Sequence, residues 1–267
     1  MWRNAAAACV IVVVATTAFT IALLRHHRDD VSCLVVAGGP GVDPARVPPG
    51  LTVIPNIAGY DGFIYYRLAL DPFSRQQTAY GITLVDMPYR QQRILYPATV
   101  WMLSCGRPTL VPTLLLLVNE ASIVAIAIIG CLIARSFGIA PAWGALFAMY
   151  PGFLHTLAHD TAEIVAAAFV LAGIAALLRH SSWTAALMFS AAVLTRETTI
   201  ILPCAAAAAW AWSVARRSPT PFSPAVFLAP IATFAAVPII TTLSAWRWVL
   251  AATTIPIWAY LALHIVR

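Results

Sequence analysis

The stretch AAAACVIVVVATTAFTIALL, residues 5–24, decides the class of this protein. It contains twenty residues and no charge, which is long enough for a helix to cross about 30 Å of hydrocarbon. Arg25-His26-His27-Arg28 follows directly, where a cleaved signal peptide would carry small residues. We therefore expect a membrane anchor rather than a signal peptide.

The whole chain has the composition of an integral membrane protein. Of its 267 residues, 61% are hydrophobic and only 10% are charged, whereas about a quarter are charged in soluble domains. All sixteen basic residues are Arg, which is typical of a GC-rich bacterial genome. The net charge of +6 does not indicate nucleic acid as a partner, because Arg in short loops orients membrane proteins.

Seven further apolar stretches predict an all-α, polytopic transmembrane bundle with about eight spans in total. We divide the chain into a first anchor (1–24), a long outer loop (25–108) and a helical bundle (109–267). The fifth span is short and is expected to end below the membrane surface. The later spans are predicted at 109–134, 140–158, 162–178, 183–194, 198–214, 225–244 and 248–266.

The outer loop carries eight Arg and six acids, and glycine and proline punctuate it. Two short interfacial helices are expected within it. The first covers residues 61–70 and ends before Pro72. The second covers 89–105; it is basic at its start and apolar later, as suits a segment at the membrane interface.

Arginine counts in the short loops predict the orientation. With a cytoplasmic amino terminus, Arg196 and Arg247 are the only arginines in short outer loops, whereas six lie on the cytoplasmic side. The positive-inside rule favours this arrangement in the cytoplasmic membrane. Three polar segments then share the outer face: the Asp61 loop and the turns at 159–160 and 196–197. The six cytoplasmic arginines are Arg3, Arg135, Arg179, Arg216, Arg217 and Arg267.

Asp61 is the leading candidate for a catalytic carboxylate. It lies between Gly59 and Gly62 at the expected start of a helix. An Asp in this place also caps helices by accepting a backbone N–H bond. The two interpretations are compatible, because a helix amino terminus favours an ionised carboxylate.

The other polar features each allow two interpretations. Asp160 and Glu163 match a capping-box-like pattern. His155 and His159 lie four residues apart and, with Asp160, offer ligands for a divalent metal; the alternative is two interfacial histidines. The Arg196-Glu197 pair marks either a tight turn or a phosphate site.

Asn119 and Glu120 lie about 16 Å from the start of their span. Such residues face the bundle interior, either as a contact between helices or as functional groups. Cys33 and Cys105 are both expected on the outer, oxidising side, and spacing leaves open whether they form a disulfide.

Several stretches together resemble the GT-C superfamily of polytopic membrane glycosyltransferases, in an uncharacterised bacterial branch. The resemblance covers roughly residues 1–215, and only the combination of motifs is specific. The motifs are Tyr60-Asp61-Gly62-x-x-Tyr65-Tyr66-x-x-Ala69, Tyr89-Arg90-x-x-Arg93-Ile94-Leu95-Tyr96-Pro97, Tyr150-Pro151-Gly152, His159-Asp160-x-x-Glu163 and Leu194-Thr195-Arg196-Glu197-Thr198.

The resemblance implies inverting transfer of a sugar from a polyprenyl-phosphate donor to a hydroxyl of a glycan or lipid acceptor. Asp61 would be the catalytic base, with Asp160 or Glu163 as a second acid. Donor-phosphate binding would fall to Arg196 with Arg90 and Arg93. No cofactor is implied with certainty, and a divalent metal is left open. Substrate-binding roles are assigned to Tyr60, Tyr65, Tyr66, Tyr96, Glu197 and Glu120.

Two departures separate this chain from many members of the superfamily. Those members have a second acid close to the first-loop Asp or in the second outer loop, and the candidates for it in this chain are limited to Asp160 and Glu163. They also carry further spans or a soluble outer domain that this chain lacks, so its acceptor-binding part would be reduced, supplied by a partner subunit, or absent. The rival functions are a non-catalytic scaffold or lipid-binding subunit, and a transporter or flippase of lipid-linked intermediates. Glu120 would be the working residue of the transporter.

Overall fold

The computed structural model describes residues 2–242, with side chains for residues 3–237. The all-α expectation is confirmed there, since the only strands in this part of the chain form one two-stranded hairpin. The last predicted span, 248–266, lies outside the described residues. So do Arg247 and Arg267, which entered the orientation count.

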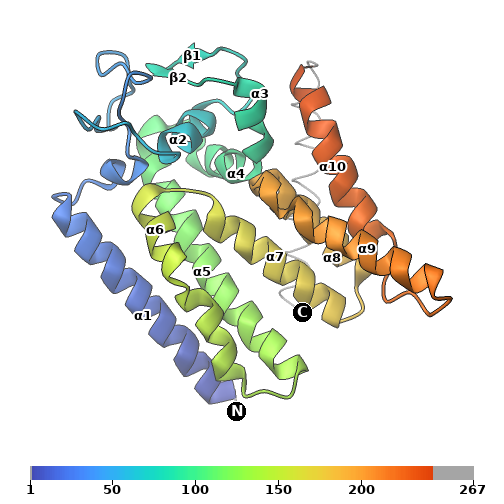
Figure 1. Ribbon diagram of the computed structural model, residues 1–267. Coiled ribbons are helices and arrows are strands. Elements are labelled where there is room, and N and C mark those ends of the chain that lie inside the picture. The colour runs from blue at the N-terminus through green and yellow to red at the C-terminus, as the bar shows by residue number, and fades with distance from the viewer. Residues whose placement is uncertain (1, 243–267) are drawn as a thin grey trace.

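The long helices lie side by side, and the elements of the outer loop cover one end of them (Figure 1). Helix α1 packs on α5 and α6, α5 packs on α7, α7 packs on α8, and α10 packs on α8 and α9. The bundle elements are α1 (Trp2–His26), α5 (Val111–Ser136), the 3-10 helix η4 (Pro141–Met149), α6 (Pro151–His159), α7 (Glu163–Leu178), α8 (Ser182–Thr195), η5 (Glu197–Ile200), α9 (Ile201–Ala215) and α10 (Ala225–Thr242).

Three helical stretches among the described residues are long and apolar enough to cross a membrane, which indicates a membrane protein. They are Arg3–His26, Pro108–Ser136 and Glu197–Ala215. The shorter apolar helices are Glu163–Leu178, Ser182–Thr195 and Ala225–Val237. The expected number of about eight spans is therefore only partly supported, because apolar stretches in this sequence also form short helices.

The predicted span at 140–158 is wrong as a single helix. The structure breaks it at Tyr150, where η4 ends and α6 begins. Tyr150 has a backbone ψ of 122°, as expected for a residue that precedes proline. Pro151 supplies no N–H, so it starts a new helix instead of continuing the old one.

The outer loop folds onto the bundle around its own apolar core. Tyr65, Tyr66 and Leu68 of α2 are buried against Tyr96 and Leu115, so the loop is no detached domain. Its elements are η1 (Val31–Val35), α2 (Gly62–Leu70), β1 (Thr78–Ala79), β2 (Ile82–Thr83), α3 (Met87–Arg90), η2 (Gln91–Arg93), α4 (Leu95–Ser104) and η3 (Pro108–Leu110).

The two interfacial helices differ in how well they match their expected bounds. Helix α2 agrees with the expectation to within one residue at its start. The second expected helix, 89–105, is divided into α3, η2 and α4. Cys33 and Cys105 are both free thiols, so the disulfide that spacing left open is not formed.

Candidate functional site

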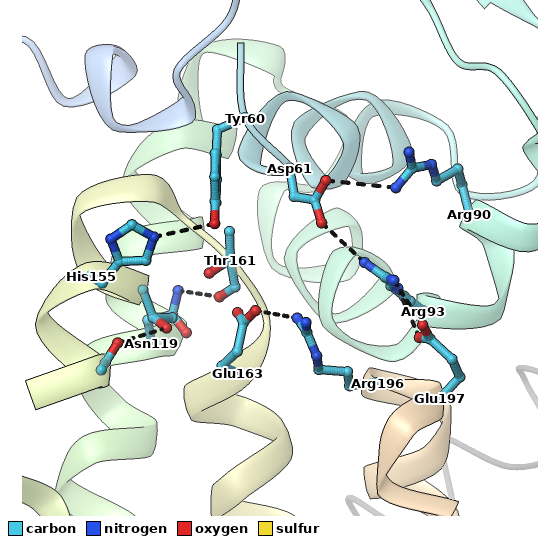
Figure 2. A network of polar contacts seen from close by, with 12 residues as sticks. Tyr60, Asp61, Arg90, Arg93, Asn119, His155, Thr161, Glu163, Arg196 and Glu197 are labelled. Carbon is cyan, nitrogen blue, oxygen red and sulfur yellow. Dashed lines mark hydrogen bonds and ion pairs between the residues drawn. The ribbon is translucent and has the colours of Figure 1, made fainter. Parts of the chain in front are cut away.

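Asp61 immediately precedes α2, but its side chain makes no capping hydrogen bond. The carboxylate turns instead toward two arginines of the segment 87–93 (Figure 2). Arg93 Nη1 donates to Asp61 Oδ2 at 3.1 Å, and Arg90 Nη1 lies 3.6 Å from Oδ1. The Asp61 side chain remains 38% exposed. Capping alone therefore does not account for this residue, and its carboxylate is open to a ligand.

Gly62 allows the backbone to place Asp61 beside the end of α6. A side chain at Gly62 would collide with the backbone carbonyl oxygens of His159 and Val35. Only a residue without a Cβ lets α2 begin directly against the end of α6. Asp61 is thereby held beside the turn that joins α6 to α7.

Arg93 joins the outer loop to the segment that begins at Glu197. Its Nε and Nη2 donate to Glu197 Oε2 and Oε1 at 2.8 and 2.7 Å, a bidentate pair. Nη2 also donates to the Tyr89 hydroxyl at 2.8 Å, and that hydroxyl donates to Glu197 Oε1 at 2.9 Å. Burial alone would lower the pKa of Arg93, but the bonds to Glu197 outweigh it and raise the pKa.

Arg196 forms a second ion pair, with Glu163 at the start of α7. Figure 2 shows this pair below Asp61 and Arg93, on the same side of the bundle. We refer to the six residues as the charged cluster. It contains three arginines and three carboxylates from four segments that are far apart in sequence: Asp61, Arg90, Arg93, Glu163, Arg196 and Glu197.

Asp160, in the turn that joins α6 to α7, forms no ion pair with the charged cluster. Its side chain is fully buried, and neither carboxylate oxygen has a hydrogen-bond partner among the described residues. Burial raises the pKa of Asp160 well above its usual value. The predicted role of Asp160 as a second catalytic acid is therefore not supported, because the group is sealed from solvent.

Three of the tyrosines with an expected substrate-binding role are buried. Tyr65 and Tyr66 belong to the core, and burial raises the pKa of Tyr66 to about 12. Tyr96 donates to the backbone oxygen of Leu115 at 2.9 Å and accepts from Asn119 Nδ2 at 2.9 Å. These tyrosines pack between helices, and in this arrangement they offer no exposed face to a sugar.

Tyr60 is exposed and lies over the histidines of α6. Its hydroxyl is 3.2 Å from His155 Nε2, and its ring centroid is 4.7 Å from that of His159. His159 Nδ1 bonds the backbone oxygen of His155 at 2.8 Å, while Asp160 turns inward. Within residues 2–242 no three His, Cys, Asp or Glu side chains form a group that could hold a metal, so the proposed metal trio does not converge.

Glu120 is also absent from the charged cluster. Its Oε1 accepts a hydrogen bond of 2.5 Å from Thr20 Oγ1, which joins α5 to α1. The neighbouring Asn119 donates to the backbone oxygen of Thr161 at 3.1 Å. Both residues of this pair thus serve contacts between helices. The assigned substrate-binding role of Glu120 has no support in this geometry.

An apolar groove of about 410 Å³ runs between α4, α5, α7 and α8. The groove and the charged cluster share helix α7, because Val165 lines the groove and Glu163 begins that helix. Along α5 the lining extends from Val118 to Ile129, which is about 16 Å of helix. The lining residues are Thr99, Leu103, Val118, Ala121, Ser122, Ala125, Ile129, Val165, Ala168, Phe169, Ala172 and Met188.

Sequence reasoning missed Tyr89 as a member of the site. Its hydroxyl hydrogen-bonds to both Arg93 and Glu197. The sequence prediction included Tyr89 only as a motif residue and gave it no role in the site. The available signal was the spacing of four residues between Tyr89 and Arg93, which places two side chains on one face of a helical turn.

Comparison of the chain with protein-family models, with curated proteins and with solved structures found no match. The resemblance to the GT-C superfamily accordingly stays a prediction.

Proposed function

We propose that this protein is a membrane glycosyltransferase that moves a sugar from a polyprenyl-phosphate donor to an acceptor hydroxyl at the outer face of the cytoplasmic membrane. The observation that carries the proposal is the position of Asp61. A partly exposed carboxylate is fixed by two arginines, and an apolar groove is lined in part by α7, the helix that begins at Glu163 of the same charged cluster. A lipid-linked sugar needs the same sequence of environments, polar at its head and apolar along its chain.

The reaction assigns one task to Asp61. Its carboxylate accepts the proton of the acceptor hydroxyl while that oxygen forms a bond to the anomeric carbon. The bond from the anomeric carbon to the phosphate oxygen breaks, and polyprenyl phosphate leaves with the bonding electron pair. A positioned general base of this kind typically contributes about 10²- to 10⁴-fold to the rate.

The three arginines have two different roles, to position the base and to bind the phosphate. Arg93 is occupied by Glu197, Tyr89 and Asp61, so it positions the base instead of binding phosphate. Among the described residues Arg90 has a 3.6 Å contact to Asp61 and a ring contact of 5.7 Å with Tyr89, which leaves its N–H donors available to a leaving phosphate. Arg196 becomes available when Glu163 releases it. Arg90 and Arg196 are therefore the proposed phosphate ligands.

The test uses the full chain in proteoliposomes supplied with a panel of polyprenyl-phosphate hexoses and pentoses, and it measures released polyprenyl phosphate. Asp61→Asn is expected to lower the rate by about 10²- to 10⁴-fold while leaving thermal unfolding nearly unchanged. Asp43→Asn is the matched control, since Asp43 is a half-exposed acid of the same loop paired with Arg46. Equal rates in the two variants would overturn the proposal.

A non-catalytic lipid-binding subunit is the second candidate, and the apolar groove favours it. The groove can hold a lipid chain without any chemistry at Asp61. A subunit of this kind would bind polyprenyl phosphate in the groove, and Asp61→Asn would leave binding intact. Released product from any donor in the panel separates the two candidates.

A further inference from the structure

Arg67, in the middle of α2, is the most unusual charged residue of the outer loop. Its side chain is 0% exposed. Nη2 donates to Ser74 Oγ at 3.1 Å, while Nε and Nη1 have no hydrogen-bond partner among the described residues. A buried charge without an anionic partner destabilises the folded protein. Binding of an anion to this guanidinium would remove that destabilisation.

Asp71 is the acid that acts most strongly on Arg67. Burial lowers the pKa of Arg67, and the negative charge of Asp71 opposes that effect. Among residues 3–237, however, Arg67 forms no ion pair within 4.0 Å. Asp71 Oδ1 instead accepts the backbone N–H of Phe73 at 3.2 Å. The donors of Arg67 therefore remain open.

The ring of Tyr80 covers Arg67. Its centroid lies 5.2 Å from the Arg67 Cζ, in cation–π geometry. Tyr80 and Gly81 form the tip of the β1–β2 hairpin, and both have positive φ, 54° and 69°. A two-residue turn of this type joins tightly paired strands. The cover is thus a short hairpin whose tip is the exposed Tyr80.

A small pocket adjoins the same ring. It has a volume of about 60 Å³, and its lining includes Tyr80, Ser104 and Arg107. The space suits about two water molecules, or one small oxyanion. Tyr80 contributes both to the wall of the pocket and to the cover of Arg67. Tyr80 therefore contacts both this space and the buried guanidinium of Arg67, and Arg107 is a second arginine at the pocket.

We propose that Arg67, Arg107 and Tyr80 form a site for a phosphate group, with the hairpin as its cover. Guanidinium groups bind phosphate through charge-assisted hydrogen bonds. A turn of the Tyr80 ring joins the pocket to Arg67, and both positive charges then face one ligand. None of these residues belongs to the charged cluster, so the site stands independently of the proposed function.

The level of the site in the fold points to lipid headgroups as one source of the phosphate. Arg107 immediately precedes Pro108, where the stretch that is long enough to cross a membrane begins. Residues at this boundary meet headgroups. Free inorganic phosphate offers the same chemistry, so an experiment must distinguish the two sources.

The first experiment follows thermal unfolding of the full chain in neutral detergent, with sodium phosphate or sodium chloride at equal ionic strength. Phosphate in roughly tenfold excess over its dissociation constant is expected to raise the midpoint by about 3 °C. Arg67→Met is expected to fold, because an apolar residue often replaces a buried charge without loss, and to show no rise. Arg75→Gln is the matched control, since it removes an exposed arginine of the same loop and should keep the rise.

A second variant keeps the test decisive if Arg67→Met fails to fold. Arg107 is exposed, so Arg107→Gln should fold normally and raise the phosphate concentration needed for half of the effect by roughly tenfold. In nanodiscs, phosphatidylglycerol should give the rise and phosphatidylcholine should not if the source is an anionic headgroup; a rise with inorganic phosphate alone assigns the site to the free ion. No rise with either source, or an equal rise in the arginine variants, overturns the site.

Discussion

Arg93 and Arg67 are both buried arginines of the outer loop, yet their surroundings are opposite. Arg93 donates to Asp61, Tyr89 and Glu197. Arg67 donates to one serine hydroxyl and keeps two nitrogen atoms unpartnered among the described residues. In the sequence, Arg67 lies between Tyr66 and Leu68, whereas Arg93 follows two glutamines and precedes Ile94.

The difference teaches that the number of satisfied donors, and not burial, separates a positioning arginine from a binding one. A saturated guanidinium has no free donor for a ligand, and its charge is already neutralised by carboxylates. An unsaturated one retains both, at a cost in stability that a ligand can remove. The predictions below test this contrast, beginning with the largest effect.

Arg93→Ala is expected to cost about 3 kcal/mol of unfolding free energy. The substitution leaves Glu197 partly buried and Asp61 half-exposed, each without its main partner, and removal of one member of a buried pair is strongly destabilising. Denaturant unfolding followed by tryptophan fluorescence measures the loss. Arg46→Ala is the control, since its pair with Asp43 is exposed and should contribute less than about 1 kcal/mol. A cost as small for Arg93 as for Arg46 would contradict the claim that Arg93 positions the cluster.

Asp160→Asn tests the buried carboxyl in the turn that joins α6 to α7, which has no hydrogen-bond partner among the described residues. Burial raises the pKa of Asp160 in the folded protein, so the folded state keeps its proton at pH values where the unfolded chain has lost it. Its contribution to stability is therefore full below about pH 4, and it is lost as pH rises from there toward the folded pKa, by about 1.4 kcal/mol per pH unit. Asn does not ionise, so the variant should lack this slope.

The measurement is the unfolding free energy of both proteins between pH 4 and pH 8, with Asp43→Asn as the exposed control. The wild type should lose stability relative to Asp160→Asn as pH rises, and the Asp43 variant should follow the wild type. Parallel curves for the wild type and Asp160→Asn would mean that Asp160 ionises normally and has a partner in solution.

Sequence reasoning located the backbone of the site well. The Asp61 loop and the turns at 159–160 and 196–197 were predicted to share one face, and the structure brings Asp61, Glu163 and Arg196 close together. Their grouping follows from helices that alternate in direction, which apolar stretches and arginine counts reveal. Pro151 also predicts the helix break before it. The apolar stretch 140–158 is nevertheless long enough to predict one span.

Pairing and burial could not be predicted in the same way. Asp61, Asp160 and Glu163 are all acids near helix ends, but Asp160 is sealed, whereas Asp61 and Glu163 are partly exposed and paired with arginines. Helix α2 has polar and apolar residues without a clear stripe, so the sequence does not tell whether Tyr65 points into the core or into the site. These properties depend on side-chain directions between segments that are distant in sequence.

The smallest expected effect comes from a matched pair of hydroxyl deletions, Tyr89→Phe and Tyr80→Phe. The Tyr89 hydroxyl joins Arg93 to Glu197, and its removal should cost about 1 kcal/mol in unfolding experiments. The Tyr80 hydroxyl has no hydrogen bond among the described residues, and the ring alone covers Arg67, so Tyr80→Phe should be nearly neutral. A Tyr80→Phe cost equal to that of Tyr89→Phe would show that the hairpin is fastened by its hydroxyl. In that case the Tyr80 ring would not be free to turn. Arg67 would then be a buried structural residue and would not bind an anion.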